Sequence, residues 1–210
     1  MKKYGFFAAF VIACGMTMLV ACQPQSETSS TPASEADNSF VESSTDATSG
    51  ETDQQPSPIE EAVDKYLVET IGKQYAQADV CIPLQIVVAS DENDDNDIKV
   101  WGDFWVFNYS IAGDTLKTAS GGSHPGLMHL KKVKDGYKVT KFEQLGDGSQ
   151  FEPTGKKIFE EKYEALLVLH ARDKEREQKR AQGIAKYVKA HDLKVTMYQD
   201  YGWPAVKLPE

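Results

Sequence analysis

The sequence predicts an α+β domain in which an N-terminal helix packs on an antiparallel sheet of about five strands, followed by two C-terminal helices. A capped amphipathic segment begins at Pro58, runs of β-branched and aromatic residues separated by short turns occupy residues 81–145, and helical periodicity returns at residue 156. Short turns join antiparallel neighbours. A block of strands between helices, rather than alternating βαβ units, is typical of α+β folds.

The first helix is predicted from Pro58 to about Ala78. Ser57 stands at its N-cap and Glu60 three residues later, which is a capping-box pattern, and Pro58 occupies the first helical position. Apolar residues then recur at helical spacing at Ile59, Val63, Tyr66, Leu67, Ile71 and Tyr75.

Five strands are predicted, at residues 81–90, 98–111, 115–120, 127–133 and 137–145. The "GGSHPG" segment, residues 121–126, is expected to be a break that separates the third strand from the fourth. Alternation along the second strand places two sets of large side chains on opposite faces, which indicates a central position in the sheet. The sets are Trp101, Trp105, Phe107, Tyr109 and Ile111, and Val100, Phe104 and Val106.

Two helices are predicted after the sheet, one over residues 156–172 and one over 181–193. The charged stretch 173–180 between them is expected to be solvated. Asp173 can cap a separate second helix, which is favoured over one continuous helix. The tail, residues 194–208, is predicted to be extended.

The first 21 residues have the layout of a secretory signal peptide, with Lys2 and Lys3 before an apolar run. The sequence Leu19-Val20-Ala21-Cys22 resembles the lipobox of bacterial lipoproteins. The resemblance implies that Cys22 becomes the first mature residue and carries lipid, so that the protein is exported and anchored to the bacterial cell membrane. An uncleaved membrane anchor is the alternative, although the apolar run is short for a spanning helix.

Residues 22–58 are predicted to be the lipidated cysteine and a disordered tether, and residues 59–210 a single globular domain. The stretch 23–58 holds 14 Ser or Thr, seven acids, no Lys or Arg and one aromatic residue, Phe40. Such a composition buries too little apolar surface to offset the entropy lost on ordering.

The net charge and the number of cysteines bear on two questions, whether the domain binds nucleic acid and whether it contains a disulfide. The chain has 23 Lys plus Arg and 32 Asp plus Glu. Leaving out Lys2, Lys3 and the seven acids of residues 23–58 gives 21 against 25, so the domain carries only about −4 and a nucleic-acid partner is not expected. Cys81 is the one cysteine expected to remain free, so no intrachain disulfide is predicted.

A leading helix across a curved antiparallel sheet is similar in layout to the cystatin-like and nuclear-transport-factor-2-like folds. The C-terminal helices depart from that plan. Together with the lipobox and the tether, the chain resembles the uncharacterised exported lipoproteins of bacteria.

Two histidines in the segment "ASGGSHPGLMHLKK" raise the question of a metal or catalytic site. His124 and His129 lie five residues apart without a third compact ligand, whereas zinc requires three or four. The adjacent glycines and proline suit a turn or a bulge, which is favoured, so neither a metal nor a cofactor is predicted. Ser120 and Ser123 lack the Gly-x-Ser-x-Gly pattern of a nucleophile elbow.

The acidic segment "DENDDNDIKVWGD" alternates carboxylates as a calcium loop does. An EF-hand would have Gly and Glu where Asn96 and Gly102 stand. A hydrated turn is therefore favoured, with weak calcium binding left open.

Aromatic residues supply the candidate ligand-binding positions: Trp101, Trp105 and Tyr109 on the central strand, and Tyr201 and Trp203 in the tail. The simpler interpretation of the first three is core packing. For Tyr201 and Trp203, together with Tyr198, it is attachment of the tail to the domain. Asp103 is the one acid between Val100 and Ile111. If buried between aromatic rings it would suit acid–base chemistry; a hydrated position at the rim of the sheet is favoured.

These features favour a membrane-anchored exported lipoprotein whose domain binds a small ligand or an envelope protein without catalysis. One alternative is a hydrolase or lyase-type enzyme that uses Asp103 with His124 or His129 in a sheet cavity. The other is a structural component of the envelope.

Overall fold

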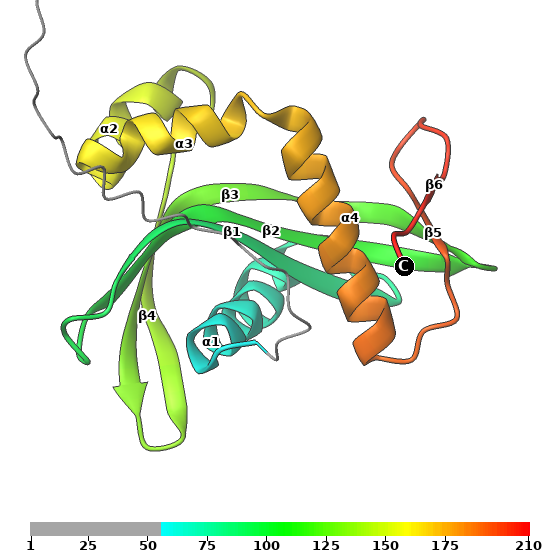
Figure 1. Ribbon diagram of the computed structural model, residues 1–210, viewed down its shortest axis with the longest axis horizontal. Helices are drawn as coiled ribbons and strands as arrows, with labels where there is room; N and C mark the ends of the chain where they lie inside the picture. Colours follow the sequence, from blue (N-terminus) through cyan, green and yellow to red (C-terminus); the bar gives the residue numbers. More distant parts are fainter. Residues whose placement is uncertain (1–55) are drawn as a thin grey trace, which may run out of the picture. The chain divides into compact units, whose positions relative to one another are not determined.

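The computed structural model describes residues 56–210, so the predicted signal, Cys22 and almost all of the predicted tether lie outside the described residues. The described part is a mixed α+β unit built on a curled, mainly antiparallel sheet with helices on both faces (Figure 1). The predicted fold class is therefore confirmed at this level. Within residues 56–210, no helix is both long and apolar enough to span a membrane.

The sheet has six strands in the described chain. They are β1 (Val80–Asp91), β2 (Ile98–Ala112), β3 (Thr115–Val133), β4 (Gly136–Gln144), β5 (Met197–Gln199) and β6 (Val206–Lys207). The order is β1-β2-β3-β5-β6, and β4 pairs with another part of β3. Only β3 and β5 run parallel; the other pairs are antiparallel.

The predicted break at residues 121–126 is wrong, because the two strands expected around it form the single strand β3. The glycines allow this continuity. A Cβ on Gly121, where φ is +135°, would lie 2.3 Å from the Val106 carbonyl oxygen, and one on Gly126 would lie 2.5 Å from the Glu143 carbonyl oxygen. A bulge does occur beside them, since the register with β2 skips Ala119.

Helix α1 (Pro58–Tyr66) begins as predicted, with both hydrogen bonds of the capping box present between Ser57 and Glu60. It continues as a π-helical turn (Leu67–Ile71) and a 3₁₀ turn (Gly72–Gln74), so the helical run ends four residues before Ala78. Gly72 allows the last turn to approach β1, since a Cβ there would lie 2.7 Å from the Cys81 sulfur.

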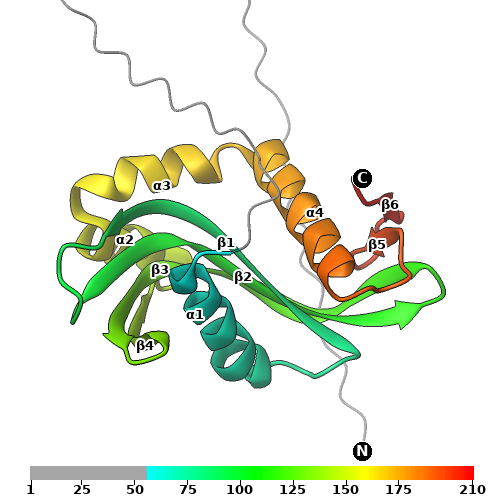
Figure 2. The ribbon, with the colours of Figure 1, turned by 60° about the horizontal axis from the view of Figure 1, so that its bottom comes forward.

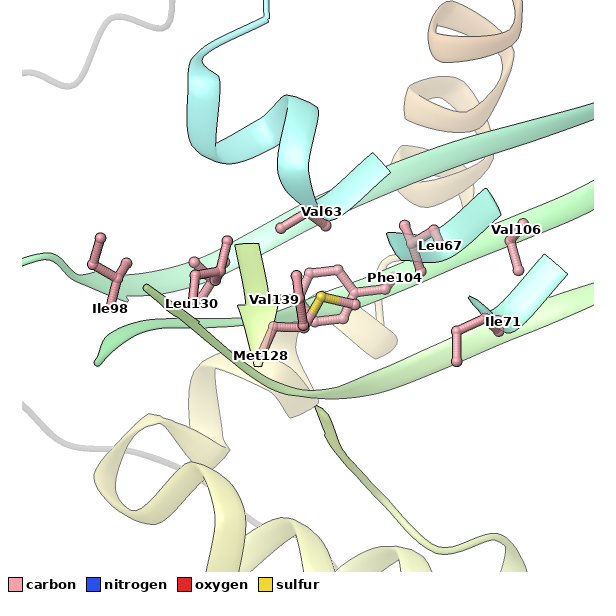
Figure 3. Packing of buried hydrophobic residues seen from close by; sticks show 10 residues of the cluster. Val63, Leu67, Ile71, Ile98, Phe104, Val106, Met128, Leu130 and Val139 are labelled. Carbon is pink, nitrogen blue, oxygen red and sulfur yellow. The ribbon is translucent and has the colours of Figure 1, made fainter. Parts of the chain in front are cut away.

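The α1 side of the sheet holds the first core (Figure 3). Val63, Leu67 and Ile71 point from the helical run onto the even-numbered side chains of β2 and their neighbours on β3 and β4. The sheet residues of this core are Ile98, Val100, Phe104, Val106, Met128, Leu130 and Val139.

The opposite side is covered by α2 (Phe151–Phe159), α3 (Tyr163–His170) and α4 (Asp173–Ala190), as Figure 2 shows. Trp101 packs with Phe159 and Leu166, and Tyr109 packs with Ile184. The molecule is thus three-layered in its described part, and β2 is buried on both faces. The predicted alternation of β2 is confirmed from Val100 to Tyr109.

Three C-terminal α-helices are present where two were predicted. The expected helix 156–172 is divided by a 3₁₀ turn (Glu160–Lys162) and starts earlier, at Phe151. Gly155 permits the close return, since a Cβ there would lie 2.3 Å from the Tyr163 ring. The predicted break before Asp173 is confirmed, although Arg172 is the N-cap and caps no amide with its side chain.

Replacing Asp64 by Asn should remove a pH-dependent loss of stability. Asp64 in α1 accepts a 2.8 Å hydrogen bond from Gln85 of β1, and burial raises its pKa to about 6, from 3.8. The folded protein therefore binds this proton more tightly than the unfolded chain, and the associated stability is present below pH 3.8 and lost as pH rises through 6.

Urea unfolding from pH 4 to pH 7 measures this effect. We expect Asp64→Asn to abolish most of the decline and to be more stable than the parent by about 1–2 kcal/mol at pH 7. Glu69→Gln, a change of the same kind on the exposed side of the helical run, is the control and should follow the parent. Parallel curves for Asp64→Asn and the parent would contradict the assignment.

Candidate functional site

Asp103 lies at the centre of β2 with no exposed surface, facing α4. Its Oδ2 accepts from Arg176 Nη2 at 2.8 Å, and its Oδ1 accepts from Ser123 Oγ at 2.5 Å. His170 Nε2 lies 3.5 Å from Oδ2. The favoured position at the hydrated rim is therefore wrong, because α4 and the end of α3 cover this part of the sheet.

A second buried ion pair lies one helical turn further along α4. Arg180, 5% exposed, forms a two-pronged pair with Asp200, with Nη1 to Oδ2 at 2.6 Å and Nη2 to Oδ1 at 2.8 Å. Nη2 also donates to the Tyr109 hydroxyl at 3.1 Å, and Thr118 donates to Asp200. The expectation that residues 173–180 are solvated is thus wrong at Arg176 and Arg180.

The pKa shifts around Arg180 follow from this geometry. Burial raises the pKa of Tyr109 to about 12, against the opposing charge of Arg180. Burial also acts to raise the pKa of Asp200, but the hydrogen bonds from Arg180 and Thr118 and the charge of Arg180 outweigh it, so the net shift is downward. Asp200 is therefore a carboxylate held ionised by its partners.

Trp105 lies against the arginines of both pairs. The Arg176 guanidinium carbon lies 5.0 Å from its ring centroid and that of Arg180 5.9 Å, while Arg180 lies 4.2 Å from the Phe107 ring. Cation–π contacts of this length add to the ion pairs. We call the set Asp103, Trp105, Tyr109, His170, Arg176, Arg180 and Asp200 the polar layer.

The two histidines of the glycine-rich segment do not join the polar layer. His124 lies on the α1 face, opposite Asp103, with Nε2 3.1 Å from the Tyr75 hydroxyl; burial lowers its pKa. His129 stands four residues beyond Pro125, the register partner of Asp103, which is roughly 13 Å along the strand. The structure therefore brings Asp103 together with neither histidine.

His129 and the acidic turn form their own contacts. Its ring nitrogens lie 2.7 Å from Asp97 Oδ1 and 3.0 Å from Glu143 Oε1. In the turn, Asp91 and Asp94 side chains accept backbone N–H groups two residues ahead. Within residues 56–210, no group of three or more His, Cys, Asp or Glu side chains is arranged so that it could hold a metal ion.

The aromatic residues predicted to bind ligand divide into two groups. Trp101, Trp105 and Tyr109 are buried between the sheet and the C-terminal helices, as the core interpretation expects. Tyr201 and Trp203 are 67% and 69% exposed. The predicted attachment of the tail is confirmed at Tyr198, which is buried with Leu208 against α4. Burial of the rings does not extend to Tyr201 and Trp203, so the prediction is wrong for Trp203, while Tyr201 is attached only through its hydroxyl.

These two exposed rings border an open hollow of about 530 Å³. Its lining includes Phe107, Arg180 and Asp200, and the middle of β3 contributes the largest run of lining residues. The full lining is Tyr75, Phe107, Thr118, Ala119, Ser120, Gly121, Arg180, Asp200, Tyr201 and Trp203. The Tyr201 hydroxyl donates to the Ala119 carbonyl, which holds the ring against β3.

Sequence reasoning missed Phe107, Arg180 and Asp200 as parts of a site. The sequence predicts Phe107 in the core and Arg180 in a solvated stretch. Two features of the sequence could have indicated the site. Arg176 and Arg180 are four residues apart and so share one helix face, and the predicted central strand carries an acid, Asp103.

Replacing Arg176 by Leu should destabilise the protein strongly, because Asp103 would remain buried without its cation. We expect a loss of about 3 kcal/mol in the free energy of unfolding, measured by urea denaturation. The double variant Asp103→Asn/Arg176→Leu should recover at least half of that loss, since no unpaired charge remains.

The matched control is Arg172→Leu. Arg172 pairs with Glu175 at 3.3 Å where both side chains are exposed, so its removal should cost no more than about 0.5 kcal/mol. Equal losses in the two single variants would mean that the Asp103–Arg176 pair has no special role in stability.

Comparison with protein-family models, curated proteins and solved structures finds no match for this chain. An accessible feature with mixed chemistry is the hollow between the middle of β3 and the rings of Tyr201 and Trp203, whose lining also includes Arg180 and Asp200.

Proposed function

We propose that this chain is an exported lipoprotein, anchored to the membrane through lipid on Cys22, whose domain binds a small ligand or an envelope protein without catalysis. The observation that carries the binding role is the hollow with two exposed aromatic rings at its edge, Tyr201 and Trp203. The anchoring role is supported by the lipobox resemblance at residues 19–22 and by the composition of residues 23–58.

The hollow has the properties expected of a binding site. Ligand sites are concavities of several hundred Å³ with apolar walls and a few placed polar groups. Here Phe107, Tyr201 and Trp203 supply apolar surface, and Thr118 and the Arg180–Asp200 pair supply polar atoms. Tyr201 and Trp203 are held by local bonds, among them one from the Gln199 side chain to the Trp203 carbonyl at 2.9 Å.

The enzyme alternative receives less support from this geometry. A general acid or base has to reach the substrate proton. Asp103 has no exposed surface and both of its oxygens accept hydrogen bonds, while His124 lies on the other face of the sheet. Arg180 and Asp200 are engaged with each other, which suits recognition of a polar group more than proton transfer.

Binding can be tested through Trp203, because Trp101 and Trp105 are buried and Trp203 alone of the three is exposed. The probes are bis-ANS, followed by its own fluorescence, and a panel of short glycan oligomers, followed by isothermal titration calorimetry. For any probe that binds the parent, Trp203→Ala should weaken binding at least about tenfold, because one well-packed contact of 1.4 kcal/mol is lost. The melting temperature should not change.

Val168→Ala is the control for this experiment, since Val168 is an exposed apolar residue on α3, away from the lining of the hollow. It should bind every probe like the parent. Equal affinity of the parent and of the Trp203→Ala variant for all bound probes would place binding outside the hollow and defeat the proposed site.

Lipidation is tested separately in cells. Cys22→Ala should leave a larger, unprocessed precursor that incorporates no labelled fatty acid. The matched control is Cys81→Ala, which changes the half-buried thiol of β1 and should leave processing intact. A Cys22→Ala protein that is processed and labelled like the parent would remove the basis for membrane anchoring.

A further inference from the structure

The outer edge of β3, opposite β2, is used at both of its ends and left open in the middle. Pairing with β5 ends at Lys117, and pairing with β4 starts at Gly126. Between them, in the described chain, the register of β3 includes only β2. We call residues 120–124 the free edge; they belong to the glycine-rich segment, and Ser120 and Gly121 line the hollow.

The direction of the backbone groups on the free edge follows from Pro125. Its carbonyl accepts the Leu145 N–H at 2.9 Å, so it points away from β2, towards the β4 side. Both backbone groups of a strand residue face the same side, and the sides alternate along the strand. The N–H and C=O of Ser123, two residues earlier, therefore also point outward.

Ser123 is exposed, and no third strand of the described chain reaches its backbone groups. Exposed edges of this kind are templates for pairing with another extended chain. Gly121 and Gly122 lack side chains, so a strand can approach closely. Tyr75 flanks the edge on the α1 side, since its hydroxyl lies 3.1 Å from a Cβ built on Gly122.

The length of the free edge limits the kind of chain that can pair with it. Five residues span roughly 16 Å, which fits a strand of five or six residues. The opening is only as long as one short strand, because β5 pairs with the same edge of β3 before it and β4 pairs with that edge after it. The β3 edge of a second folded copy carries its own β4 and β5, which would collide with these strands. A single extended segment without a sheet of its own fits instead.

We propose that the free edge binds an extended polypeptide segment of a partner protein by strand addition, with one apolar side chain of that segment placed in the hollow against Phe107 and Trp203. This rests on the proposed binding role of the hollow and specifies its ligand. The backbone groups of Ser123 supply main-chain hydrogen bonds, and the aromatic rings supply selectivity for one side chain.

Two substitutions at one position separate the backbone from the side chain. Ser123→Pro removes the outward N–H and is compatible with an edge strand, where proline is tolerated. It also removes the hydroxyl that bonds Asp103, and Ser123→Ala removes that hydroxyl alone. Any difference in peptide binding between these two variants therefore reports on the backbone edge.

The probes are acetylated and amidated hexapeptides in which Thr alternates with Val, Leu, Phe or Tyr, titrated against the parent by fluorescence. We expect at least one to bind the parent, and Ser123→Pro to bind it at least about tenfold more weakly than Ser123→Ala, as expected for one lost hydrogen bond. The same peptide with alternate backbone nitrogens methylated should fail to bind. Ser123 amide exchange should slow in the complex.

The outcomes distinguish this inference from the proposed function. If a peptide binds, depends on Trp203, and is indifferent to both N-methylation and Ser123→Pro, the hollow is a binding site but strand addition is wrong. If no hexapeptide binds while bis-ANS or a glycan does so through Trp203, the inference falls and the binding role stands. Should no probe of any kind bind, both fall. If Ser123→Pro does not fold, the methylated peptides decide.

Discussion

The burial of Asp103 is the constraint on which the arrangement of the C-terminal half depends. A carboxylate without exposed surface is tolerated when a cation and hydrogen-bond donors surround it, and Arg176, with Ser123, fulfils that need. The pair fixes which face of α4 meets the sheet. Because Arg180 lies one turn further on that face, the same docking brings it over Phe107 and within reach of Asp200.

The position of the tail follows from Arg180. Asp200 is drawn to the guanidinium group, and β5 pairs with the first residues of β3 just before it. Tyr198 packs inward against α4, while Tyr201 and Trp203 lie beyond the ion pair and remain exposed. The hollow is therefore a consequence of how the polar layer ends, since its last ion pair and the turn after it both contribute to the lining.

The two faces of the sheet have different physical roles. The α1 face is an apolar core with the buried His124 at its margin. Burial lowers the pKa of His124 and so favours its neutral form. The α4 face combines apolar packing with ion pairs that specify one arrangement of helix and tail. An apolar face tolerates small shifts of packing, whereas a two-pronged ion pair holds only in one geometry. The binding surface that we propose is built on the more precisely held face.

Local patterns in the sequence determined the elements that depend on neighbouring residues. The capping box at Ser57 and Glu60, the two-faced alternation of β2 and the break before Asp173 are properties of a few consecutive residues, and each is present. The continuity of β3 through Gly121 could not be predicted, because it depends on the backbone of β2 lying where any larger residue would collide. For Arg176 and Arg180 the sequence shows a shared helix face, but it does not show that this face is buried. A mixed-charge helix is solvated unless a distant strand presents an acid to it, and only the tertiary structure places Asp103 and Asp200 there. The candidate site was predictable to the extent that Tyr201 and Trp203 stand in an aromatic tail; their partners come from elements far apart in the chain, and only folding unites them.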